Sequence, residues 1–220
     1  MAHFLSLSGI QARAAETPQI PKLFFEYSWL YDGVCSGETP VDSSWADEAR
    51  DRTPEFQALW DRESPAVFQP IFDRFGYGLS RAELTATLSV CSKAPSMSHP
   101  LIINVSRFLK SYMGTRPPLG EDRFVDVVFH ELLHSFVMEH LPRATPLLER
   151  YSGESKRARN HLHLMALQIY SYTQLGRTNA LDWLEFSYSK LIGGDYARAW
   201  DIVRRIEGEE AFLAEFPTIR

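Results

Sequence analysis

The sequence predicts a fold that contains both strands and helices, with the expected strands confined to the first half of the chain. Residues 84–90 alternate apolar and polar side chains without a break, a pattern typical of a strand with one buried face. The first half of residues 121–141 instead carries apolar side chains nearly all round a helix, which indicates that this helix is buried. With 220 residues, 45% of them hydrophobic, the chain can bury a sizeable core and form one domain.

The chain before residue 84 is expected to form a strand, a loop and two helices. Residues 23–31 place an aromatic side chain at every second position from Phe25 onward, which predicts a strand. Residues 33–42 are rich in Gly, Pro and Ser, and we expect a loop there. A Thr-Pro pair at 53–54 and a Ser-Pro pair at 64–65 each resemble a helix N-cap followed by proline at the first helical position, so each predicts the start of a helix.

A second strand and a series of helices are expected in the rest of the chain. Alternation returns within residues 101–109, which predicts a strand just before the helix at 121–141. Three further helices are expected at residues 155–175, 179–192 and 195–207, because their apolar residues recur at helical spacing. We assign these apolar stripes to core packing.

One motif in the expected buried helix carries most of the functional information, His130-Glu131-Leu132-Leu133-His134. Histidines four residues apart lie on one face of a helix, so both imidazoles can reach the same metal ion. Glu131, rotated by about 100° from His130, can reach a water bound to that ion. Burial of three such side chains without partners is costly, and a metal with its water would satisfy them. The alternative is a pair of hydrogen-bonded core histidines.

A third metal ligand is needed, because hydrolytic zinc sites take three protein ligands and leave a fourth position for water. The candidates are His140, Glu154, and the pair His161 and His163 on the helix expected at 155–175. Helix positions two apart point about 200° away from each other, so one histidine of the pair can bind the metal and the other cannot easily do so. His161 projects nearer the apolar stripe and is favoured, and His163 remains a candidate.

The HExxH motif, the strand expected just before it and a later helix with a further ligand resemble the zincin superfamily of zinc metallopeptidases. The resemblance covers about residues 84–175. It implies an α+β fold, in which a small twisted sheet packs on the motif helix and a mainly helical C-terminal lobe follows. The layout is closest to the thermolysin-like arrangement of two helices, with His161 or His163 in place of the glutamate of that family.

Two zincin patterns would use Glu154 or His140 as the third ligand in place of His161 or His163. In the thermolysin-like pattern Glu154 stands at a spacing after His134 close to that of the family, but the residues around it look like the entry to a helix, and the Asn-Glu pairing of the family is absent. In the metzincin pattern His140 stands at the required position, but Val137 replaces the glycine at which the helix must break. All three routes remain open at this point.

The resemblance also implies a mechanism and a mode of substrate binding. In such enzymes zinc activates a water, and Glu131 would act as the general base that takes the water proton. An extended peptide substrate would pair with an edge strand, for which residues 101–109 are the candidate. The motif specifies the activated water and not the acyl group. A zinc hydrolase of non-peptide substrates and an exported metal-binding or interaction protein without catalysis are therefore the alternatives.

Supporting roles are expected for some polar neighbours of the motif. Asp126 lies one turn before His130 and could accept the second N–H of that imidazole, or it could interact with the helix N-terminus. Tyr170, Tyr172 or the histidine that does not bind metal could donate a hydrogen bond to a developing oxyanion. Spacing does not select among them.

Charge and hydropathy limit the partners. The chain has 23 basic and 28 acidic residues, a net charge of −5 and no basic cluster, so a nucleic-acid partner is disfavoured. No apolar run approaches the roughly 18 to 20 residues that cross a bilayer. We therefore expect a peptide or protein substrate and no membrane span.

Residues 1–20 are a possible signal or leader segment. A weak apolar stretch at residues 4–10 precedes Ala-Arg-Ala at 12–14, which has the small-x-small form of a signal-peptidase site. We expect a periplasmic or secreted protein in which residues 21–220 form a single zincin-like metallopeptidase domain, with a cytoplasmic protein as the alternative.

Two cysteines, Cys35 and Cys91, are compatible with either location. An exported protein could pair them in a disulfide, whereas a cytosolic protein would keep them as two thiols. Their spacing does not decide between these states.

Overall fold

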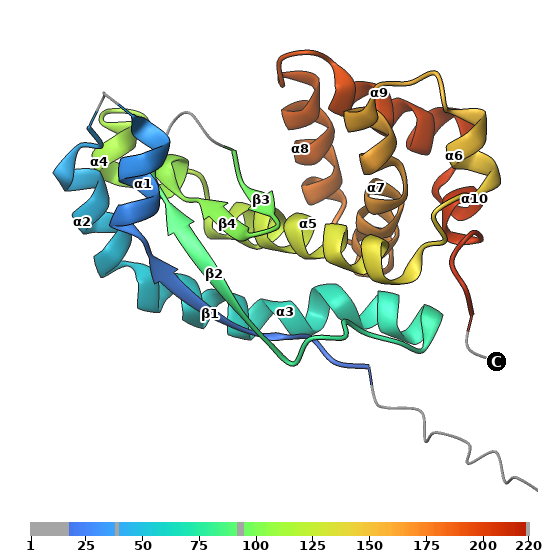
Figure 1. Cartoon of the computed structure of the whole chain (residues 1–220), viewed down its shortest axis with the longest axis horizontal. Coiled ribbons are helices and arrows are strands. Elements are labelled where there is room, and N and C mark those ends of the chain that lie inside the picture. Colours follow the sequence, from blue (N-terminus) through green and yellow to red (C-terminus); the bar gives the residue numbers. More distant parts are fainter. Residues whose placement is uncertain (1–17, 38–39, 92–94, 219–220) are drawn as a thin grey trace, which may run out of the picture.

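The computed structural model describes residues 18–37, 40–91 and 95–218, and it has the expected α+β fold. A small sheet packs beside the helix that carries the HExxH motif, and a mainly helical lobe follows along the chain. Figure 1 shows the sheet at one end of the molecule and the C-terminal helices at the other. Two long helices, α3 (Thr53–Phe75) and α5 (Glu121–His140), contact both parts and join them.

The sheet combines three parallel strands with one short antiparallel strand. β1 (Lys22–Tyr27), β2 (Glu83–Ser89) and β4 (Leu101–Asn104) are parallel, and β3 (Met97–Ser98) runs antiparallel to β4. The order across the sheet is β1-β2-β4-β3. β2 confirms the strand expected from alternation at residues 84–90, because one row of its side chains turns toward the core.

The expectation that residues 101–109 form an edge strand is wrong. β4 ends at Asn104, and Ser106–Phe108 forms a short 3-10 helix. β4 also lies inside the sheet, because the chain turns at His99 and Pro100 and places β3 on the outer side of β4. A strand of two residues shows no period, so alternation alone cannot predict β3 as the edge strand.

The strand expected at residues 23–31 ends early, at Tyr27. The Ser28 hydroxyl accepts a hydrogen bond of 3.2 Å from a backbone N–H in the first turn of α1 (Trp29–Ser36) and caps that helix. Part of the loop expected at 33–42 is therefore the end of α1. The alternation of aromatic residues predicted too long a strand because Trp29 and Tyr31, in the first turn of α1, happen to continue the pattern.

One long helix replaces the two helices expected to begin at residues 53–54 and 64–65. α3 continues through Pro65 and Pro70, although proline lacks the N–H that a helix interior needs. Buried apolar residues lie on both sides of these prolines and pack against α5 and the C-terminal lobe, which stabilises the helix as one piece. The structure also contains α2 (Ser43–Asp51), which the sequence pattern did not predict.

The C-terminal lobe is helical, as predicted. α7 (Lys156–Gln174), α8 (Thr178–Ser189) and α9 (Asp195–Asp201) match the three expected helices, and η2 (Ile202–Glu207) continues α9 as a π-helical segment. Two short helices were not predicted, α6 (Pro146–Arg150) and α10 (Glu209–Leu213). The lobe therefore surrounds α7, which contacts α3, α5, α8, α9 and α10.

A contiguous cluster of buried apolar side chains joins the sheet to the lobe. α5 contributes Phe124, Val128, Phe129 and Leu133 to it, and none of these is exposed to solvent. The helix α4 (Lys110–Met113) leads from the sheet toward α5. The polar residues of the HExxH motif are thus carried by a helix whose position the core determines.

Cys35 and Cys91 form a disulfide, which links α1 to the chain just after β2. Asp32 on α1 strengthens this link, because its buried carboxylate accepts hydrogen bonds from the backbone N–H groups of Val90 and Cys91. The question that cysteine spacing left open is therefore answered by the fold.

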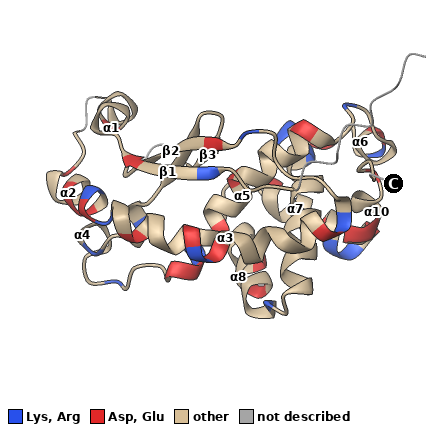
Figure 2. Ribbon diagram, turned by 90° about the horizontal axis from the view of Figure 1, so that it is seen from below, with Lys and Arg blue, Asp and Glu red and all other residues tan. Residues whose placement is uncertain are grey.

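Residues 1–17, most of the expected leader segment, lie outside the described residues. Of the helices in the described ranges, none is both long enough and apolar enough to cross a membrane. Basic and acidic residues are interspersed along the ribbon in Figure 2, in agreement with the mixed charge pattern of the sequence.

Candidate metal centre

α5 places the two motif histidines on one side of a helix that is mostly buried. The four-residue spacing brings the rings of His130 and His134 to a centroid distance of 5.2 Å. His130 is buried, and His134 is partly exposed. The helix begins at Glu121 with Asp122 beside it, and acidic side chains in a first turn stabilise the positive end of the helix dipole.

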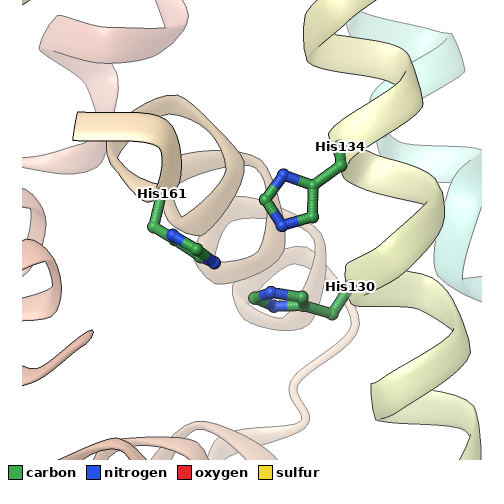
Figure 3. Close-up of side chains that lie close together, drawn as sticks. All are labelled: His130, His134 and His161. Carbon is green, nitrogen blue, oxygen red and sulfur yellow. The ribbon is translucent and has the colours of Figure 1, made fainter. Parts of the chain in front are cut away.

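α7 brings a third histidine, His161, to the same place. Its ring lies 5.3 Å from His130 and 4.8 Å from His134 between centroids. One ligand nitrogen from each of the three histidines lies within 4.8 Å of the other two. Figure 3 shows the three rings converging from two neighbouring helices. Three imidazoles arranged in this way are close enough to bind one metal ion.

Hydrogen bonds select the nitrogen that each buried histidine offers. His161 Nδ1 lies 2.7 Å from the carbonyl oxygen of Arg157, which only accepts, so Nδ1 carries the proton and Nε2 carries the lone pair. Tyr188 Oη donates to Gln168 Oε1 at 3.1 Å and lies 3.1 Å from His130 Nδ1. His130 Nδ1 therefore donates to Tyr188, which leaves the lone pair of His130 on Nε2.

The three histidines fit a metal ion on two observations. The buried Nε2 of His161 has no hydrogen-bond partner among the described residues, which leaves a polar atom unsatisfied unless a further group binds it. Burial lowers the pKa of His130 well below its ordinary value and that of His134 to about 3, and the neighbouring histidines add to both shifts. Neutral imidazole is the form that binds metal, and three imidazoles are a frequent zinc ligand set.

Glu131 is buried beside the histidines on α5. Burial raises the pKa of its carboxyl group to about 8, because the ionised form loses its hydration. A cation bound by the three histidines would act in the opposite direction and favour the carboxylate. The protonation state of Glu131 is therefore sensitive to the charge beside it.

His163, the other histidine considered as a ligand, is not in the cluster. Its Nε2 lies 2.7 Å from Glu215 Oε2, and its ring packs against Phe212 and Phe216. The reason is helical geometry, since the rotation of about 200° between His161 and His163 turns them to different sides of α7. The structure thus corrects the assignment of His163 as a metal ligand and supports the preference for His161.

The other two candidate ligands also have partners elsewhere. His140 Nε2 lies 2.7 Å from the carbonyl oxygen of Gly78, and its ring contacts Phe136 on its own helix. Glu154 forms an ion pair of 2.7 Å with Arg198. Because α5 continues unbroken through Val137, His140 does not swing back toward the motif, as the absence of glycine predicts.

Of the two roles considered for Asp126, acceptance of the second N–H of His130 is wrong. Its carboxylate accepts hydrogen bonds from Tyr172 and, at 3.0 Å, from Arg123, and the partner of His130 is Tyr188. No local signal in the sequence points to Tyr188, because it lies on α8 and reaches His130 only when the lobe packs on α5.

The tyrosines proposed to assist an oxyanion are also placed by the fold. Tyr172 is engaged with Asp126, and Tyr170 lies beneath the Arg74 guanidinium. Tyr196, which the sequence did not single out, packs its ring 4.3 Å from that of His161 between centroids. Tyr196 is therefore nearer the three histidines than the tyrosines that the helix pattern suggested.

Comparisons of the chain with models of protein families, with curated proteins and with solved structures find no match. The interpretation of the three-histidine cluster therefore depends on its own geometry and chemistry.

Proposed function

We propose that this chain is a zinc-dependent hydrolase, and specifically a metallopeptidase of the zincin type, with His130, His134 and His161 as zinc ligands. The observation that carries the proposal is the buried Nε2 of His161, which lies beside two further neutral imidazoles and has no hydrogen-bond partner within residues 18–37, 40–91 and 95–218. Glu131, adjacent to His130 on the same buried helix, supplies the carboxylate that a metal centre without catalysis would not need.

The proposed mechanism assigns one task to each of these residues. His130, His134 and His161 would hold a zinc ion, which would supply a Lewis acid that activates water and polarises a carbonyl group. The Glu131 carboxylate accepts a proton from the attacking water and returns it to the departing amine. Tyr188 keeps His130 in the tautomer that presents Nε2.

A peptide substrate is supported by the position of β3. This strand is the outer strand of the sheet next to β4, and it contacts α5. An extended peptide can add to such an edge by backbone hydrogen bonds. The strand leads directly into His99, which lines the same cavity as His134, so a peptide on this edge would run close to the three histidines.

The first test is metal content. Purified protein should bind about one zinc per chain, and His161→Ala should lose this zinc while His140→Ala keeps it. Mass spectrometry of the metal after dialysis measures both. A chain that takes up no zinc at micromolar concentration would remove the basis of the proposal.

The second test separates catalysis from metal binding. Glu131→Gln should retain zinc and lose hydrolysis of a mixed peptide library by about 10²- to 10⁴-fold, the usual contribution of a general base. Glu154→Gln is the matched control, since it makes the same change outside the cluster, and it should keep full activity. Zinc binding with no hydrolysis by the wild type favours a binding protein, and hydrolysis of esters alone favours a non-peptide substrate.

We also propose that the protein works in an oxidising compartment, in the periplasm or outside the cell. The disulfide between Cys35 and Cys91 supports this location, because disulfides persist there and are rare in the cytosol. Protein isolated from its native cells in the presence of an alkylating reagent should have the mass of the disulfide form. A mass that shows two alkylated cysteines would contradict the proposal.

A further inference from the structure

A cavity of about 360 Å³ borders the three-histidine cluster. His134 forms part of its wall, together with Met138 on α5, Arg159 and Asn160 on α7, and His99 after β3. The volume is in the range of small-ligand pockets. Because His134 belongs to both the wall and the cluster, a group bound in this cavity lies next to the position where the proposed reaction takes place.

The charge of this cavity is uncompensated. Arg159 in its wall carries a permanent positive charge, and none of the described residues that line the cavity is Asp or Glu. The buried Nε of Arg159 has no hydrogen-bond partner, and no carboxylate pairs with its guanidinium in the part of the chain that the structure describes. A guanidinium stays charged in proteins, so the buried Nε–H of Arg159 requires an acceptor.

Other partly buried arginines of the chain have such acceptors. Arg52 pairs with Glu55 at 2.6 Å, Arg74 with Glu210 at 2.6 Å, and Arg123 with Asp126 at 3.0 Å. Arg159 differs from these, because no Asp or Glu of the described residues pairs with it. A larger cavity of about 480 Å³ near the start of α5 is unsuitable as an anion site, because four acidic residues line it beside three arginines.

We propose that Arg159 binds a carboxylate of the substrate in the cavity beside His134. The carboxylate is either an acidic side chain next to the bond that is cut or the C-terminal carboxylate of a peptide. A planar guanidinium matches a carboxylate in shape and charge, and Asn160 and Ser98 in the same wall supply further hydrogen-bond donors. This inference rests on the proposed peptidase function and names the class of peptide that the site selects.

The test measures binding of uncleaved peptides, so that it does not require turnover. Dansyl-labelled peptides of one neutral sequence carry Glu or Gln at one position and end in an acid or an amide. They are titrated by fluorescence anisotropy into zinc-treated Glu131→Gln protein. The peptide with the matching carboxylate should bind about tenfold more tightly than the neutral peptide, as expected for one charge-assisted ion pair. The Glu/Gln arm and the acid/amide arm identify the source of the carboxylate.

Variants then assign the preference to Arg159. Arg159→Gln should abolish the tenfold difference while leaving binding of the neutral peptide unchanged, and Arg159→Lys should retain part of it. Arg143→Gln removes the same charge from an exposed position outside the cavity and should retain the full difference. Circular dichroism spectra establish that each variant is folded.

The outcomes separate this inference from the proposed function. Equal binding of acidic and neutral peptides by folded protein, or no binding of either, overturns the carboxylate site even if the wild type hydrolyses peptides. A preference for acidic peptides that Arg159→Gln leaves intact also overturns it. A preference that depends on Arg159 supports the carboxylate site even if the wild type hydrolyses no peptide, in which case the proposed function alone fails.

Discussion

His161 and His163 stand two residues apart on α7, are both buried, and serve two different regions of the molecule. The Nε2 of His161 lies beside two other imidazoles and has no hydrogen-bond partner in the described part of the chain. The Nε2 of His163 is 2.7 Å from the Glu215 carboxylate. Burial therefore does not distinguish a candidate ligand from a structural histidine. What distinguishes the two histidines is whether another group of the described chain is hydrogen-bonded to the Nε2 atom.

The region around His163 has the features of a structural cluster. Glu215 accepts hydrogen bonds from the Thr145 hydroxyl and, at 2.7 Å, from the backbone N–H of Leu147. Together with His163 it joins α7 and the start of α6 to the C-terminal segment. Glu215 thus pairs the Nε2 atom of His163 within the chain, which is the atom that corresponds to the unsatisfied Nε2 of His161.

The largest expected difference between the two histidines is in zinc affinity. His161→Ala removes one of three ligands and should weaken zinc binding by more than about 100-fold, since even indirect partners of a ligand contribute 10- to 100-fold. His163→Leu should leave zinc affinity unchanged. Competition with a chelating dye measures both, and a similar loss in the two variants would show that the comparison is wrong.

The next effect is on the pH dependence of the free energy of unfolding of the metal-free protein. Burial lowers the folded pKa of His134 to about 3, below its unfolded value near 6.5, so the unfolded chain binds more protons in this interval. The contribution of neutral His134 to the free energy of unfolding is fully present above pH 6.5 and is lost as the pH falls toward 3. Between pH 7 and pH 4 the wild type should lose roughly 3 kcal/mol relative to His134→Asn.

Urea unfolding of the metal-free proteins at pH 7, 5.5 and 4 measures this difference. The variant His163→Leu is the comparison, because the hydrogen bond to Glu215 opposes the lowering of the His163 pKa by burial. Its removal should change the pH dependence less than the removal of His134. Parallel curves for the wild type and His134→Asn would contradict the assigned pKa.

A smaller effect is expected on the stability of the His163 region. His163→Leu keeps a side chain of similar size but leaves the Glu215 carboxylate without one partner, which should cost about 2 kcal/mol in the free energy of unfolding at pH 7. His140→Leu, which breaks a hydrogen bond to a carbonyl oxygen nearer the surface, should cost about 1 kcal/mol. Urea unfolding measures both variants, and equal losses would argue against a special role of Glu215.

The smallest effect tests the support of the ligand His130. Tyr188→Phe removes the hydroxyl that accepts from His130 Nδ1 and should weaken zinc binding about tenfold. Tyr151→Phe removes a hydroxyl that is hydrogen-bonded to Glu207 and not to a histidine, and it should leave zinc binding unchanged. A loss of zinc affinity in neither variant would show that the orientation of His130 does not depend on this hydrogen bond.

Much of the fold was accessible to prediction where a regular period extended over a long segment. β2, α5, α7 and the two helices that follow α7 were each expected close to their observed ranges. Prediction failed where elements were short or where packing overrode local signals. β3 has two residues, and α3 continues through Pro65 because its apolar side chains are buried on both sides of that proline.

In the candidate site, too, local geometry could be predicted from the sequence and packing could not. The sequence by itself determined that His130, Glu131 and His134 share a buried helix, because the spacing of residues on a helix is a local property of the chain. It also determined that His161 and His163 turn to different sides of α7. Only the tertiary structure decided which of these two faces α5, because that choice depends on how two helices pack.

The partners of the histidines were likewise decided by the tertiary structure. Tyr188 reaches His130 from α8, Glu215 reaches His163 from the C-terminal segment, and Cys35 meets Cys91 across 56 residues of chain. Such contacts join residues that are distant in sequence, and no periodic pattern encodes them. The physical reason is that the position of a side chain on its helix is set by local geometry, whereas its neighbour is set by the packing of the whole core.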